Sequence, residues 1–138
     1  MDIWGEPGVT AEAELVGALF SLLDAIGLAR GDVKVRVNNR ALLEESLREG
    51  ILAQRPEIFE PLCVVIDKLA KIGPDAVVEQ LTDSSGDVGL DEPAARDVIA
   101  MLSAQSLDEA AQHVSPGSPA LEDMRRFFDL LDAYGVQE

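Results

Sequence analysis

The chain has 138 residues, 47% of them hydrophobic, which suffices for the core of one domain or of a modest domain with an appendage. Eleven Lys and Arg stand against 26 Asp and Glu, and the net charge of −15 repels phosphate and anionic lipid surfaces. A single cysteine excludes an internal disulfide framework, and no apolar run approaches the roughly 20 residues that cross a bilayer. We therefore expect a cytoplasmic protein with no membrane partner.

The first predicted element is a helix over residues 11–26, "AEAELVGALFSLLDAI". Thr10 is placed to cap its start, and Gly27 supplies a stop signal. An apolar stripe recurs along the helix at helical spacing, at Leu15, Leu19, Leu22 and Ile26.

A short strand is predicted next, because valines at 33, 35 and 37 alternate with Lys34 and Arg36. One strand cannot satisfy its own backbone hydrogen bonds, and the rest of the chain is predicted to be helical. We therefore expect its sheet partners to lie outside this chain. Open strand edges also predict a homo-oligomer or marginal stability for the chain by itself.

Helix start and stop signals divide the rest of the chain. Asn39 is a good N-cap for a helix that Gly50 ends. Pro56 starts a longer helix that runs to Gly73, in which Pro61 is expected to kink the helix or delay its start.

Further along, a short helix over 74–81 and a loop precede a helix opened by Asp91. Ser106 and Glu109 match the capping-box spacing at the start of another. "SPGSP" at 115–119 is the strongest linker signal. The predicted final helix has one apolar face, made of Leu121, Met124, Phe128, Leu131 and Tyr134.

No residue pattern in the chain predicts a catalytic or metal site. His113 is interpreted as a surface or helix-end histidine, and Cys63, with apolar neighbours, as an inert thiol. The loop "DSSGDVG" matches neither a phosphate-binding loop nor a calcium loop and is interpreted as a solvated turn. Only Lys34, Arg36 and Arg40 concentrate positive charge, which the residues alone leave open as a phosphate contact or an ordinary exposed surface.

Four segments, in order, resemble histidyl-tRNA synthetase, a class II ligase, from the end of its motif 2 through the insertion before motif 3. "MDIWG…TAEAEL" resembles the end of motif 2, and "VKVRVNNRALLEESL" the family's strand, its Asn-Asn-Arg joint and a leucine-rich helix. "VIDKLAKIG" resembles its Asp-Lys-Leu helix, although Ala70 replaces a common acid, and "LEDMRRFFDLLDAYGV" resembles the return helix. The resemblance covers nearly the whole chain.

The resemblance implies a mainly α (α+β) fold: a helical insertion domain with one or two short β segments left from an antiparallel catalytic sheet. The implied domains are a catalytic-core remnant at 1–39, the insertion at 40–116 and a return helix at 117–138. Motif 1, the front of motif 2, motif 3 and the anticodon-binding domain have no counterpart here, so the chain is expected to be inactive alone. ATP and magnesium would belong to the parent enzyme, and the rest of its catalytic domain would be the partner.

By position, Asp2 falls on the family's acidic residue that holds the histidine amino group, here interpreted as a remnant. The insertion is expected to help engage the acceptor end of tRNA, with Lys34, Arg36 or Arg40 as contacts. Two alternatives remain: a synthetase-like regulatory module without catalysis, and a stand-alone acidic helical adaptor for protein partners.

Overall fold

The computed structural model describes residues 2–29 and 31–136, and the chain divides into two compact units. The hairpin unit combines Met1–Asn39 with Gly117–Glu138, and the central unit is Arg40–Pro116. That the hairpin unit is a catalytic-core remnant and the central unit an insertion remains a prediction.

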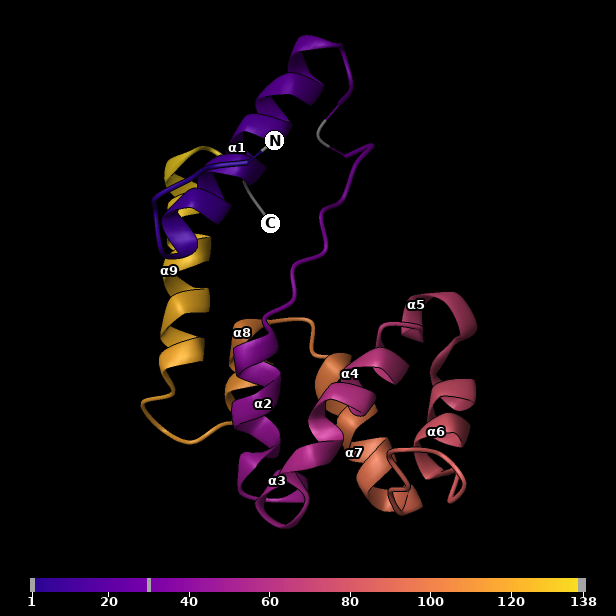
Figure 1. The fold of residues 1–138 in the computed structure, drawn as a ribbon. Helices are drawn as coiled ribbons and strands as arrows, with labels where there is room; N and C mark the ends of the chain where they lie inside the picture. The colour runs from indigo at the N-terminus through magenta and orange to yellow at the C-terminus, as the bar shows by residue number, and fades with distance from the viewer. Residues whose placement is uncertain (1, 30, 137–138) are drawn as a thin grey trace. The chain divides into compact units, whose positions relative to one another are not determined.

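Two helices, α1 (Val9–Ala25) and α9 (Pro119–Ala133), lie side by side in the hairpin unit (Figure 1). Their shared core buries Ala13, Phe127 and Leu131. The small Ala13 side chain lets the helices approach closely, and Phe127 is the largest of the three side chains. The core of this unit is therefore small and lies along one side of α1.

The start of α1 differs from the prediction, and its end agrees with it. The helix begins at Val9, so the prediction that Thr10 caps it is wrong; Gly8 occupies the N-cap. Val9 packs against the hairpin core, which explains why the helix extends to include it. At the other end Gly27 has φ +84°, a conformation that glycine adopts readily and that ends the helix.

The predicted strand is not formed. Residues 33–39 run without regular secondary structure, and the described parts of the chain contain no strand (Figure 1). A strand is held by hydrogen bonds to a neighbouring strand, and alternating valines do not supply one. The mainly helical fold is therefore confirmed. The β segments expected as remnants of a catalytic sheet are not formed in the described residues, and the prediction is corrected on this point.

Short helices make up the central unit (Figure 1). In chain order they are α2 (Arg40–Arg48), α3 (Ile51–Gln54), the 3-10 turn η1 (Pro56–Ile58), α4 (Phe59–Ile66), α5 (Leu69–Ile72), α6 (Pro74–Thr82), α7 (Glu92–Leu102) and α8 (Leu107–Ala111). One continuous core joins most of them, burying Leu43, Leu47, Leu52, Ile58, Phe59, Leu62, Ile66, Val77, Leu81, Val88, Leu90, Ala95 and Val98. This unit therefore has a core of its own, and among its large apolar side chains Val64 and Ile72 stay exposed.

The predicted helix between Pro56 and Gly73 is divided into η1, α4 and α5, and prolines shape its first part. Pro56 opens the 3-10 turn η1, and α4 begins only after it, at Phe59. Pro61 lies in the first turn of α4, where its missing N–H would have had no helical partner. Of the two expectations for Pro61, a delayed start is therefore confirmed and a kink is not needed.

Side-chain caps begin the later helices, as predicted. The Asp91 carboxylate accepts a hydrogen bond from the Ala94 N–H at 2.8 Å, at the start of α7. The Ser106 hydroxyl accepts one from the Glu109 N–H at 3.2 Å, and the Glu109 carboxylate accepts one from the Gln105 N–H at 2.7 Å. These bonds satisfy N–H groups that a helix start leaves without helical partners.

Candidate functional site

Arg40, one of the predicted tRNA contacts, is the first residue of α2, and its side chain reaches the start of α4. Its guanidinium pairs with the Glu60 carboxylate and lies over the Phe59 ring, 5.2 Å from the ring centroid. The hydrogen bond and the charge of Glu60 raise the pKa of Arg40. Because both side chains of the pair are largely exposed, 56% and 76%, the contact orients the guanidinium more than it stabilises the fold.

Cys63 lies one turn beyond Phe59 on α4 and is half-buried. Burial raises the pKa of the Cys63 thiol, and the positive charge of Arg40 lowers it in part. The neutral thiol is therefore favoured over the nucleophilic thiolate. This agrees with its interpretation as an inert side chain.

Lys34 and Arg36 lie in the irregular segment 33–39, and both side chains are exposed. Across the described residues neither of them takes part in an ion pair. They belong to the hairpin unit, whereas Arg40 belongs to the central unit. Since the charge of Arg40 is shared with Glu60, Lys34 and Arg36 are the more accessible of the three, and their contact with tRNA remains a prediction.

The other residues singled out from the sequence lie at the surface. Asp2 is exposed in the segment before α1, and its role as a remnant of a histidine-binding site remains a prediction. His113 is exposed just after α8, and its backbone N–H donates to the Ala110 carbonyl at 3.1 Å. It is a helix-end histidine, as interpreted from the sequence.

The acidic loop after α6 is a turn held by its own side chains. The Asp83 carboxylate accepts hydrogen bonds from the Ser85 N–H at 2.8 Å and from the Ser85 hydroxyl at 2.6 Å. These bonds lower the pKa of Asp83, because they favour its charged form. The Gly86 N–H donates to the Asp83 carbonyl at 3.0 Å, which closes the turn. The interpretation of this loop as a turn is confirmed.

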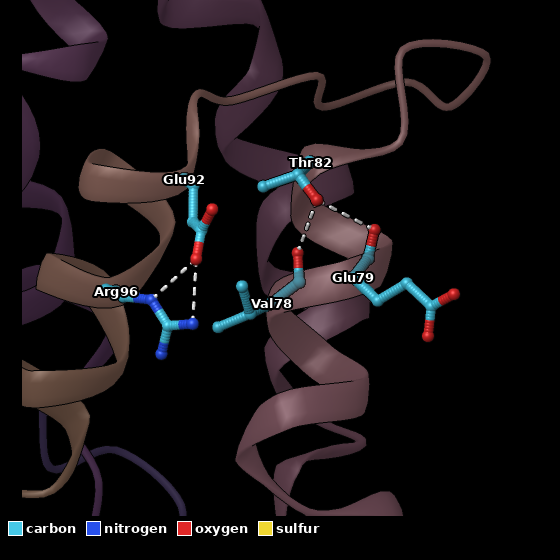
Figure 2. A network of polar contacts seen from close by, with 5 residues as sticks. All are labelled: Val78, Glu79, Thr82, Glu92 and Arg96. Atoms are coloured by element: carbon cyan, nitrogen blue, oxygen red, sulfur yellow. Dashed lines mark hydrogen bonds and ion pairs between the residues drawn. The ribbon is translucent and has the colours of Figure 1, made fainter.

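Figure 2 shows the polar contacts on α6 and α7, beside this loop. On α7 the Arg96 guanidinium donates to the Glu92 carboxylate at 3.0 and 2.8 Å. On α6 the Thr82 hydroxyl donates to the carbonyls of Val78 and Glu79 at 3.0 and 3.2 Å. All of these contacts join residues three or four positions apart within one helix: the Glu92–Arg96 pair supports α7, whereas the Thr82 hydroxyl only satisfies its hydrogen bond locally on α6.

Sequence reasoning missed the contacts that two arginines make across the central unit. Arg40 and Glu60 are 20 positions apart. The Arg55 guanidinium donates to the Gly89 carbonyl at 3.1 Å, over 34 positions. No local spacing rule relates residues so distant in sequence, and only the packing of the helices brings them together.

Within residues 2–29 and 31–136, no three His, Cys, Asp or Glu side chains gather closely enough to hold a metal ion. None of the helices in these same ranges is long and apolar enough to cross a membrane.

Known proteins match the chain along its entire length. It is 33% identical over 138 residues to the chloroplastic/mitochondrial histidine–tRNA ligase of Arabidopsis thaliana, covering 100% of this chain and 27% of that protein. It is 34% identical over 151 positions to the histidine–tRNA ligase of Rhizobium leguminosarum bv. trifolii, covering 97% of this chain and 30% of that protein. A histidine–tRNA ligase of Mesorhizobium japonicum is 41% identical over 78 positions, which is 55% of this chain and 16% of the relative. No family model matches the sequence.

Proposed function

This chain belongs to the histidine–tRNA ligase family, and from that premise we propose that it acts as part of an enzyme that uses ATP to charge tRNA with histidine. The observation that carries the proposal is the identity to such ligases along the full 138 residues. The chain spans only about 30% of the length of these relatives, so the proposed activity needs the rest of the enzyme.

We propose a different role in the enzyme for each of the two units. The hairpin unit would lie in the catalytic domain, and the central unit would help engage the acceptor end of tRNA. Residues 41–110 of the central unit contain fifteen acids and five bases, a balance that repels a phosphate backbone. Contact with tRNA is therefore proposed to depend on local bases: Arg40 in the central unit, and the exposed Lys34 and Arg36 in residues 33–39 of the hairpin unit, which directly precede the central unit in the sequence.

ATP and magnesium are proposed to bind in the rest of the enzyme, in the cytoplasm. When bound, they would supply the activated phosphate and the positive charge that in-line attack by the histidine carboxylate requires. In this chain, Asp2 is exposed and carries a carboxylate suited to pairing with an ammonium group, as the histidine amino group presents. We assign no catalytic residue to the chain.

A chimeric enzyme tests the proposal directly. Residues 1–138 replace the matching segment of the Rhizobium leguminosarum ligase, and charging of tRNA with histidine is measured. We expect the chimera to charge tRNA. A second chimera in which a short linker replaces Arg40–Pro116 should still form histidyl-adenylate, measured by pyrophosphate exchange, but should charge tRNA poorly. A folded first chimera without either activity would contradict the proposal.

The proposed tRNA contact is tested in the same chimera. Lys34→Glu with Arg36→Glu should raise the KM for tRNA about tenfold and leave pyrophosphate exchange unchanged, because two phosphate contacts become repulsive. Arg125→Glu with Arg126→Glu is the matched control, since it makes the same change in charge on the exposed side of α9. Equal effects of the two pairs would show that only overall charge matters and would contradict a specific contact.

A further inference from the structure

Each arginine of the central unit pairs with a carboxylate. Among the described residues the pairs are Arg40–Glu60, Arg48–Glu44, Arg55–Glu57 and Arg96–Glu92. Three of them join residues two or four positions apart, whereas Arg40 and Glu60 are 20 positions apart and join α2 to α4. The pairing of Arg40 is thus the one of these ion pairs that the packing of the helices creates.

The Arg40 guanidinium is supported by an aromatic ring and remains accessible to solvent. It lies over the Phe59 ring, 5.2 Å from the ring centroid, and Phe59 is a buried member of the central core. The ion pair itself stays at the surface, with 56% of the Arg40 side chain and 76% of the Glu60 side chain exposed. Exposed ion pairs contribute little net stability, so another anion can replace the carboxylate at low cost.

We propose that Glu60 competes with a backbone phosphate of tRNA for the Arg40 guanidinium, and that Glu60 thereby sets the affinity of this contact. The inference rests on the proposed function, in which Arg40 is one of the local bases that contact tRNA. Carboxylate and phosphate are alternative partners, because the planar fork of a guanidinium matches both. Without tRNA, Arg40 pairs with Glu60; with tRNA bound, it pairs with the phosphate.

The groups around the pair favour such an exchange. The Phe59 ring attracts a cation whichever anion that cation binds, so it keeps the guanidinium beside α4 throughout. Glu60 lies in the first turn of α4, where the helix dipole favours a negative charge, so its carboxylate stays stabilised after Arg40 leaves it. Because like charges repel, Glu60 beside an incoming phosphate opposes binding, and a neutral side chain at this position would not.

The experiment uses the chimera of this chain with the Rhizobium leguminosarum ligase and measures the Kd for a fluorescently labelled histidine tRNA by anisotropy. Glu60→Gln removes the competing charge and keeps the shape of the side chain. Glu92→Gln is the matched control, because it removes the same charge from an exposed pair of the same unit, in which Glu92 and Arg96 are 65% and 60% exposed (Figure 2). Arg40→Met, alone and combined with Glu60→Gln, completes a double-mutant cycle.

We expect Glu60→Gln to lower the Kd for tRNA about fivefold, because Arg40 no longer has to leave a charged partner. Glu92→Gln should change the Kd by less than about twofold, and so should Glu60→Gln in the Arg40→Met background. Arg40→Met alone should raise the Kd about threefold, since one phosphate contact is lost.

The salt dependence of binding gives a second measurement, which a merely structural role of Glu60 would not change. A phosphate contact made by an unpaired base adds roughly 0.7–0.9 to the magnitude of the slope of log K against log salt concentration. An exchange adds less, because the released Glu60 carboxylate takes up a cation as the phosphate gives one up. We therefore expect Glu60→Gln to steepen the slope by about this amount, and Glu92→Gln to leave the slope unchanged.

Two results would overturn the inference whatever the activity of the chimera. Weaker tRNA binding after Glu60→Gln would show that Glu60 positions Arg40 for tRNA and does not compete for it. Equal gains from Glu60→Gln and Glu92→Gln, or a gain that persists in the Arg40→Met background, would show that only overall charge matters.

The same measurements separate this inference from the proposed function. A reference chimera that never charges tRNA, yet binds it more tightly after Glu60→Gln, would reject the proposed function and retain the competition. A chimera that charges tRNA, with a Kd that Glu60→Gln leaves unchanged, would retain the proposed function and reject the competition.

Discussion

The central unit and the hairpin unit handle apolar surface in opposite ways. In the central unit, helices of modest length bury a continuous core in which Leu62, Val77 and Leu81 are fully covered. In the hairpin unit, the longest helix of the described chain, α1, shares a small core with α9, and its Leu22 and the C-cap residue Ile26 stay exposed. A long apolar helix is therefore not a sign of a complete core, because burial depends on how many neighbours surround it.

The comparison predicts where substitutions cost most. We expect Leu62→Ala to destabilise the central unit by about 2–5 kcal/mol, because it removes a fully buried side chain and leaves a cavity. Val64→Ala, two residues along the same helix but largely exposed, should cost no more than about 0.5 kcal/mol. Urea unfolding followed by circular dichroism measures both. Similar costs for the two would mean that the central core is looser than described.

Loss of a helix cap should cost less than loss of core volume. Asp91→Ala removes the acceptor for the Ala94 N–H at the start of α7, and we expect a loss of about 1 kcal/mol in the same unfolding measurement. Asp91→Asn keeps an acceptor oxygen at this position and should retain most of the stability. If Asn were as damaging as Ala, the charge of Asp91 and not its cap bond would be the stabilising feature.

A change in the hairpin unit should act in the opposite direction. A Cβ at Gly17 would lie 3.3 Å from two ring carbons of Tyr134, a tight contact with a half-exposed side chain that has room to shift. Removing a glycine from within a helix gains roughly 0.5–1 kcal/mol, so we expect Gly17→Ala to stabilise the hairpin by about 0.5 kcal/mol. Thermal melting of the chain measures this, with the bulkier Gly17→Leu as the destabilising control. A loss of stability with alanine would show that Tyr134 is held rigidly.

The smallest effect is expected where the Arg40 side chain of α2 reaches α4, the helix that carries Cys63. Burial raises the pKa of the Cys63 thiol in the folded state. The stability that the thiol contributes is therefore fully present at pH values below its unfolded-state pKa, and it is lost as the pH rises through its folded-state pKa. Arg40→Met removes the charge that lowers this pKa, so we expect slower alkylation by iodoacetamide and a rate profile displaced to higher pH. Arg55→Met is the control. An unchanged profile would place the guanidinium away from the thiol.

Local signals in the sequence predicted much of the helical structure. The caps at Asp91 and Ser106 lie within three residues of the N–H groups they accept from, so spacing alone identified them. The stop at Gly27 likewise depends on one residue's backbone freedom. The start of α1 was misplaced at Thr10, because the packing of Val9 against α9 is not a local property.

Features that depend on distant residues could not be predicted in this way. Alternating valines at residues 33–37 indicated a strand, but a strand also requires a partner, and periodicity does not say whether one exists. The spacing of Leu22 and Ile26 identified a helix without showing that their side would be uncovered. For the candidate site, Arg40 was identified by its charge, but its pairing with Glu60 follows only from the packing of α2 and α4.

Amide hydrogen exchange of the 138-residue chain tests the contrast between the units most directly. We expect the amides of α4, α6 and α7 to be the best protected, because their side chains fill the central core. Amides in the C-terminal half of α1, around Leu22, should exchange at least about tenfold faster, since Leu22 is 56% exposed and the core shared with α9 is small. Protection of α1 equal to that of α4 would contradict the view that the hairpin core is the weaker of the two.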